Sequence, residues 1–432
     1  MMEWRFSCKM MFNNKDIVDV SLVLARLYLD PKKDILNERW NKVKKTFLKI
    51  AKNNTLYNEL IKFLSENRVL EIVLENCNKI NDNCLKVLIR DIQVQMKKNI
   101  KNVDATFIKD APDFFKNDKI IMIKGSSLSQ LYPLNYKRYQ VDVDIIVQCI
   151  DDVWNVLKRT KKIYQYDRLK LYTSRNGKLS ASIDLIPFDT NYPYIDVHVS
   201  PFEIWGSINY DIDLWKKADS LDNGLFIPSK EDMLILLTAH LAKQWMYRIR
   251  DINDCFLILR NYELDWDYIY TQCKKYNLIK LLSILMKRVE EVYELELHDE
   301  RFKNNMTFFD NLFFKHNLGV QRVYTSFGIE FQYVFNYYKS NSNLFIALKN
   351  SLKNTKNLIV YKNRAYKINK KRKIKRFKEN EIIVLKPTKK TFKLHNKRLL
   401  TGTSMFIVNE GEKDEYFETP VCNWIQSSYY VK

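Results

Sequence analysis

The chain has 432 residues, of which 46% are hydrophobic and 13% aromatic, and its seven cysteines are scattered without a CxxC pair. This length and composition predict a folded protein of two to four structural units and exclude a disordered chain. The scattered cysteines exclude a zinc hydrolase. No apolar run reaches the roughly 18 residues that a membrane helix needs. The formal net charge of +21 either favours a nucleic-acid partner or reflects surplus lysine on a tolerant surface. We therefore expect a soluble, cytoplasmic protein without membrane contact.

Helical and strand-like patterns alternate along the chain. From about residue 16 to 100, apolar residues recur at helical spacing. Between about 118 and 200 the pattern changes to short β-branched runs, which predict strands at 119–125, 141–147, 182–188 and 194–200, with a helix at 151–161. Helical periodicity returns from about 228 to 300, where Ser229 is the expected N-cap.

The C-terminal part concentrates the positive charge. Residues 353–398 hold 18 Lys and Arg against two acidic residues. Within this stretch, segment 362–398 is either a solvated charged face or an RNA contact, in which its interleaved aromatic residues would stack on bases. The patterns predict an α+β protein with four parts: an N-terminal helical region (1–104), an α/β core (105–220), a helical domain (221–345) and a small basic C-terminal module (346–432).

The segment from Gly125 to Asp144 contains the residues that suggest a chemical function. A strand runs into Gly125, Ser126 and Ser127, and a second strand then brings Asp142 and Asp144. Without a Cβ, the glycine lets backbone N–H groups approach phosphate oxygens, and the serines add hydroxyl donors. Residues two apart on a strand share a face, so the two carboxylates would repel unless a cation such as Mg²⁺ sits between them. The spacing predicts a phosphate cradle beside a metal site that could hold two Mg²⁺ ions.

These motifs resemble a nucleotidyltransferase family of the polymerase-β-like superfamily. The matching positions are Lys124-Gly125, Leu131-Tyr132-Pro133, Arg138 and the DxD pair, Asp142 and Asp144. Family members usually have small apolar residues after the glycine, where this chain has two serines. The resemblance implies a polymerase-β-like core with a mixed sheet, NTP as substrate and Mg²⁺ as cofactor.

The resemblance continues downstream and supplies further candidate residues. It implies Asp196 as a third metal-binding and catalytic carboxylate, with Asp184 as its competitor. The implied nucleotide-binding positions are Lys124, Gly125, Ser126, Ser127, Arg138 and Lys243. Arg138 would either contact the triphosphate or brace the loop before the DxD strand. His198 and His240 are interpreted as structural histidines, and the remaining matches are Arg248, Asp251 and Asp254.

The expected reaction is transfer of a nucleoside monophosphate from an NTP to an acceptor hydroxyl with release of pyrophosphate. A small-molecule acceptor is the first hypothesis, and a tRNA or protein acceptor is the nearest variant. Two other classes stay open: a glycosyltransferase that uses its DxD carboxylates to hold a metal, and a catalytically silent RNA-binding protein on the same fold.

Overall fold

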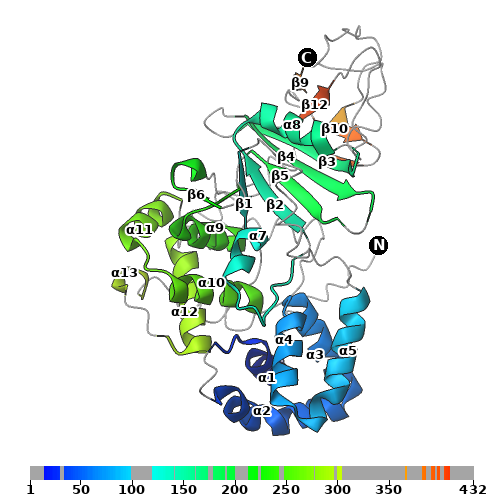
Figure 1. The fold of residues 1–432 in the computed structure, drawn as a ribbon, viewed down its shortest axis with the longest axis vertical. Coiled ribbons are helices and arrows are strands. Elements are labelled where there is room, and N and C mark those ends of the chain that lie inside the picture. Colours follow the sequence, from blue (N-terminus) through cyan, green and yellow to red (C-terminus); the bar gives the residue numbers. More distant parts are fainter. Residues whose placement is uncertain are drawn as a thin grey trace, which may run out of the picture.

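The computed structural model describes residues 14–29, 34–98, 119–140, 142–160, 162–173, 179–189, 192–199, 213–221, 225–242, 248–276, 278–295 and 299–303, together with the backbone of five short C-terminal strands. Two helical parts, one N-terminal and one that follows the sheet strands in the sequence, lie together below a mixed sheet in the view of Figure 1. The predicted α+β fold class is confirmed. The proposed limits of the four parts stay a prediction.

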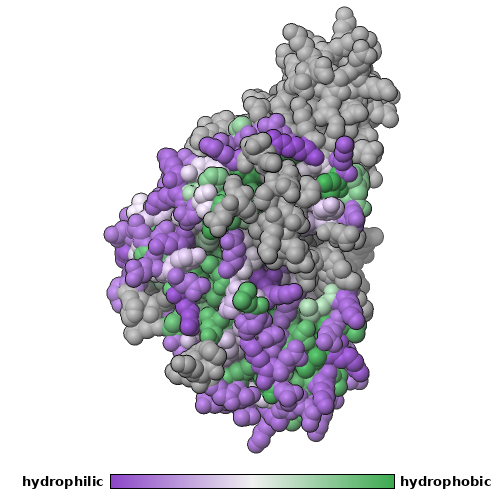
Figure 2. Space-filling view, in the orientation of Figure 1, coloured by the Kyte–Doolittle hydropathy of each residue, from purple (hydrophilic) through white to green (hydrophobic). Residues whose placement is uncertain are grey.

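The N-terminal region is helical, as the apolar spacing predicted. Asn53 illustrates the local cause: its side-chain oxygen accepts hydrogen bonds from the backbone N–H groups of Thr55 and Leu56, at 3.0 and 3.2 Å, and so starts a new helix directly after the previous one. The face of this region that Figure 2 shows is mostly hydrophilic. The helices are α1 (Lys15–Ala25), α2 (Ile35–Lys52), α3 (Asn54–Glu66), α4 (Leu70–Ile80) and α5 (Lys86–Lys98), with a 3-10 turn at Asn83–Leu85.

The central sheet has the strand order β6-β7-β1-β2-β5-β4-β3 and continues through two C-terminal strands, β12 (Thr403–Val408) and β9 (Ile382–Leu385). It is mixed, because β2 runs parallel to β5 whereas β1 and β4 run antiparallel to their neighbours β2 and β5. The predicted strands are present, and β3, β6 and β7 are additional strands that the sequence patterns did not reveal. The bounds are β1 (Ile120–Ile123), β2 (Asp142–Val147), β3 (Tyr164–Thr173), β4 (Leu179–Pro187), β5 (Tyr194–His198), β6 (Asp219–Ser220) and β7 (Phe226–Ile227).

Short helical segments connect these strands. The turn after β1 forms α7 (Gly125–Leu128) and a 3-10 turn (Ser129–Leu131), and α8 (Ile150–Thr160) follows β2. A further 3-10 turn, Leu214–Lys216, precedes β6. The N-terminus of α7 therefore lies where β1 ends, next to the start of β2.

The second helical part follows β7. Ser229 caps α9 as predicted, with its hydroxyl oxygen 3.2 Å from the backbone nitrogen of Asp232. Helicity predicted to continue across Tyr276 is interrupted there, where the backbone leaves the helical conformation. None of the described helices is long and apolar enough to cross a membrane. The helices are α9 (Lys230–Ala242), α10 (Ile249–Asn261), α11 (Trp266–Lys275), α12 (Ile279–Tyr293) and α13 (Glu300–Lys303).

The two helical parts share one hydrophobic core, which runs from Ile17 in α1 to Phe302 in α13. Buried polar contacts join them as well. The Asn253 side-chain amide donates to the backbone carbonyl of Ala25 at 2.9 Å, and the backbone N–H of Leu27 donates to the Tyr293 hydroxyl at 3.1 Å. The N-terminal helices are therefore packed into the rest of the molecule.

The C-terminal strands are described by their backbone alone. They are β8 (Ala365–Tyr366), β9 (Ile382–Leu385), β10 (Thr391–Leu394), β11 (Lys397–Arg398) and β12 (Thr403–Val408). Strand β12 pairs antiparallel with β3 on one side and with β9 on the other. Most of the basic segment 362–398, including its densest run at 370–376, lies outside the described residues.

Candidate active site

Three carboxylates lie side by side on neighbouring strands of the sheet. Asp144 of β2 is in register with Asp196 of β5, and Asp196 is in register with Asp184 of β4. Side chains directly opposite one another on paired strands share a face and lie close together. The register therefore gathers negative charge at the centre of the sheet.

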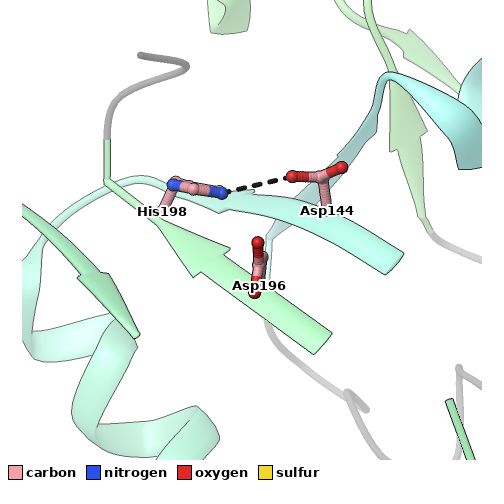
Figure 3. A group of neighbouring side chains, drawn as sticks. All are labelled: Asp144, Asp196 and His198. Carbon is pink, nitrogen blue, oxygen red and sulfur yellow. Dashed lines mark hydrogen bonds and ion pairs between the residues drawn. The ribbon is translucent and has the colours of Figure 1, made fainter. Parts of the chain in front are cut away.

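His198 completes a compact group with two of these carboxylates. One ligand atom each from Asp144, Asp196 and His198 lies within 4.8 Å of the others, and the His198 Nε2 is 3.3 Å from Asp144 Oδ1 (Figure 3). Its other ring nitrogen, Nδ1, is buried without a hydrogen-bond partner among the described residues. Carboxylate oxygens suit Mg²⁺, and an imidazole nitrogen adds a ligand that other divalent metals accept readily. This donor set could hold a divalent metal ion.

The electrostatics of the group also fit a cation. Burial, followed by the charges of Asp144 and Asp184, raises the pKa of Asp196 to about 8. Burial and the Asp144 carboxylate likewise raise the pKa of Asp142. Carboxyl groups that resist ionisation because of burial and neighbouring negative charge are stabilised in their ionised form by a bound cation.

Lys124 supplies a positive charge in the described structure. Its ammonium group pairs with the Asp144 carboxylate. Burial alone would raise the pKa of Asp144, but Lys124 and His198 together hold it below its ordinary value. The backbone of Lys124 has a φ of 53°, which is uncommon for a residue with a side chain. This conformation turns the chain sharply between β1 and α7.

The predicted phosphate cradle lies beside this group. Ser127 donates its hydroxyl to the Lys124 carbonyl at 3.1 Å, which closes the turn, whereas the hydroxyl of Ser126 is fully buried and has no hydrogen-bond partner within the described part of the chain. A Cβ on Gly125 would approach the Arg138 Nη1 to 2.9 Å. The position therefore favours glycine, because a Cβ would require the Arg138 guanidinium or the backbone to shift.

Arg138 forms a buried ion pair with Asp254 of α10. Its Nε and Nη2 donate to the two oxygens of that carboxylate at 2.7 and 2.6 Å, and both side chains are buried. This geometry favours the bracing role for Arg138, while Nη1 points toward Gly125. A direct nucleotide contact by Arg138 stays a prediction.

The structure thus brings together most of the residues that the sequence singled out: Lys124, Gly125, Ser126, Ser127, Arg138, Asp142, Asp144 and Asp196. Lys243 lies outside the described residues. Asp196 joins the metal-competent group, whereas Asp184 lies one strand further along. The sequence interpretation assigned His198 a structural role. Its position two residues after Asp196, on the same strand face, was the signal that could have placed it in the site.

Residues 53–294 match the model of a family described as uncharacterised nucleotidyltransferase. No curated protein matches the chain. A crystal structure of a candidate nucleotidyltransferase from H. pylori is 14% identical, covers 47% of this chain and 85% of its own, and has a TM-score of 0.27. The structure of JHP933 from Helicobacter pylori is 12% identical, covers 58% and 95%, and has a TM-score of 0.28. At these TM-scores, neither structure establishes a shared fold.

Proposed function

We propose that this chain, which belongs to the uncharacterised nucleotidyltransferase family, transfers a nucleoside monophosphate from an NTP to an acceptor hydroxyl and releases pyrophosphate. One observation carries the proposal: Asp144 and Asp196 face each other across β2 and β5, directly beside the turn that begins at Gly125. This arrangement supports a metal-binding carboxylate pair next to the proposed phosphate cradle.

The residues divide into two groups by role. Asp142, Asp144 and Asp196 would hold Mg²⁺, which supplies charge neutralisation at the phosphates when bound. Gly125 and Ser126 hold the triphosphate, because the glycine exposes backbone N–H groups and the buried serine hydroxyl has a donor to offer.

Asp196 would take the proton of the acceptor hydroxyl. Burial and neighbouring carboxylates raise the pKa of Asp196 in the absence of a cation, and a bound cation would hold the carboxylate in the ionised form that accepts a proton. Lys124 contributes a fixed positive charge beside Asp144. Positioning and charge stabilisation would then supply most of the rate, without a covalent intermediate.

A small molecule is the proposed acceptor, and a tRNA or protein acceptor is the variant to be distinguished. The test incubates the full chain with Mg²⁺ and each α-labelled NTP, with and without cell extract or bulk tRNA. Pyrophosphate release and the destination of the label are followed together. Label in a small molecule supports the first acceptor class, and label in RNA or protein supports the second.

The matched comparison is a double variant, Asp142→Asn with Asp144→Asn, against Asp213→Asn, which removes an exposed carboxylate elsewhere. Transfer should vanish in the double variant and persist in the Asp213 control. Circular dichroism spectra of both variants are compared with that of the parent chain to check that the variants are folded. Undiminished turnover in the folded double variant would contradict the proposed roles of the two carboxylates.

A further inference from the structure

The turn between α3 and α4 joins the N-terminal helices to the start of α10. Arg68 occupies this turn with a φ of 57°, a conformation that residues with large side chains rarely adopt. Its neighbour Asn67 is fully buried and accepts a hydrogen bond from the backbone N–H of Ile249 at 2.9 Å. The turn is therefore fixed to the first residue of α10.

This attachment brings three guanidinium groups together. Ile249 is flanked by Arg248 and Arg250, and both lower the pKa of Arg68 to about 10, after the larger effect of burial. Asp142 acts on Arg68 in the opposite direction. The arginines of the α3–α4 turn and of the α10 N-terminus thus lie within electrostatic reach of one another and of the first DxD carboxylate.

The side chain of Arg68 lies over an aromatic ring. Its guanidinium carbon lies 6.0 Å from the centroid of the Tyr139 ring, in the segment that leads into β2. Among the described residues, it forms no salt bridge or side-chain hydrogen bond. A partly buried guanidinium that stacks on an aromatic ring keeps its N–H donors available for an anion.

Arg250 provides an independent observation. Its side chain is only 5% exposed, and its Nε has no hydrogen-bond partner within the described residues. Its Nη2 donates to Asp251 at 3.1 Å. A buried N–H donor without a partner is costly, so its persistence beside two other arginines points to an anionic ligand.

We propose that Arg68 and Arg250 bind phosphate groups of the NTP triphosphate beside Asp142, so that the N-terminal helices complete the nucleotide site. The proposal rests on the proposed function. Guanidinium groups recognise phosphate oxygens through paired N–H donors, which a lysine cannot reproduce. The triphosphate is favoured over an acceptor anion because Asp142, a predicted metal ligand, lies within the same cluster.

Binding of inorganic tripolyphosphate to the full chain in the presence of Mg²⁺ tests the proposal by calorimetry. Arg68→Gln should weaken binding by about tenfold or more, as expected for the loss of a hydrogen bond to a charged group. Arg68→Lys should recover only part of the affinity, because it restores the charge but not the paired donors. Arg90→Gln removes an exposed arginine of the same helical region and should leave the affinity unchanged.

Tripolyphosphate affinity that is unchanged in folded Arg68→Gln would overturn the proposal. So would a loss confined to single-stranded RNA binding, because the arginines would then serve the acceptor. The label-transfer assay separates this inference from the proposed function. If tripolyphosphate binding depends on Arg68 but no NTP yields transfer, the anion site stands and the proposed reaction fails. If transfer proceeds but tripolyphosphate binding does not depend on Arg68, the proposed reaction is supported and the proposed anion site is contradicted.

Discussion

Asp254 holds together a buried polar cluster behind the candidate active site. It accepts two hydrogen bonds from Arg138, at 2.7 and 2.6 Å, and one from the Tyr132 hydroxyl at 2.8 Å. The Arg138 and Asp254 side chains are 4% and 0% exposed. Because water cannot replace a lost partner there, we predict that Asp254→Ala is severely destabilising.

The magnitude follows from the contacts that are lost. Removing one member of a buried ion pair costs about 3–5 kcal/mol, because the remaining guanidinium is left uncompensated. The Tyr132 hydroxyl, also without its acceptor, adds about 1–3 kcal/mol. The total is comparable with the whole stability of many proteins, about 5–15 kcal/mol. Tyr132→Phe, which removes a single hydrogen bond to a charged group, should cost about 1.5–3 kcal/mol.

Urea unfolding of the parent chain and the variants provides the assay. The urea concentration at the midpoint of unfolding should fall furthest for Asp254→Ala and less for Tyr132→Phe. The slope of the unfolding free energy against urea concentration should stay unchanged if the surface exposed on unfolding is the same. A third variant, Arg138→Leu combined with Asp254→Leu, removes both charges. It should be more stable than Asp254→Ala, because no unpaired charge remains buried.

A loss below about 1 kcal/mol in Asp254→Ala would refute this reasoning, because that value is typical of a solvent-exposed pair. A double variant less stable than Asp254→Ala would also contradict it. Either result would mean that Arg138 reaches water or another anion, and its direct contact with the nucleotide would then gain weight over the bracing role.

Three further predictions concern single residues. Gly125→Ala should weaken NTP binding by about tenfold or more in an equilibrium titration, because its Cβ would meet Arg138 Nη1 at 2.9 Å and displace the turn; unchanged affinity would contradict a tight fit. Asp196 has a folded-state pKa of about 8, above its ordinary value of about 3.9, so metal-free stability should fall as pH rises between these values. Asp196→Asn should flatten the pH dependence of the melting temperature, measured at several pH values. An unchanged pH dependence would contradict the raised pKa of Asp196. Ser229→Ala should cost about 0.5–2 kcal/mol in urea unfolding, because Asp232 N–H loses its cap, whereas no loss would show the cap to be dispensable.

Local patterns predicted the strands that build the site. The β-branched runs before Gly125 and through Asp142 and Asp144 correspond to β1 and β2, and the family resemblance is confirmed by the match over residues 53–294. Strand β3 was missed because its alternation of polar and apolar residues changes phase between Tyr166 and Arg168, where its pairing with β4 has a register shift.

Contacts between distant segments could not be read from the sequence. The pairing of Asp144 with Asp196 depends on strand register, and the approach of Arg68 to Asp142 depends on how two helical parts pack. A single sequence carries no direct signal for such long-range geometry. The position of His198 beside the carboxylates was not foreseen for the same reason: it depends on Asp144 of the neighbouring strand, whereas the sequence shows only its own strand.

The core shared by the first and last described helices has a consequence for synthesis of the chain. Arg26 donates to the backbone carbonyl of Val292, across a separation of 266 residues. At about 5–20 residues per second, translation takes roughly 13–53 s to cover that distance. During this interval the first helices have apolar faces without their final partners. Nascent chains should therefore stay sensitive to proteolysis, and depend on chaperone protection, until α12 has left the ribosome.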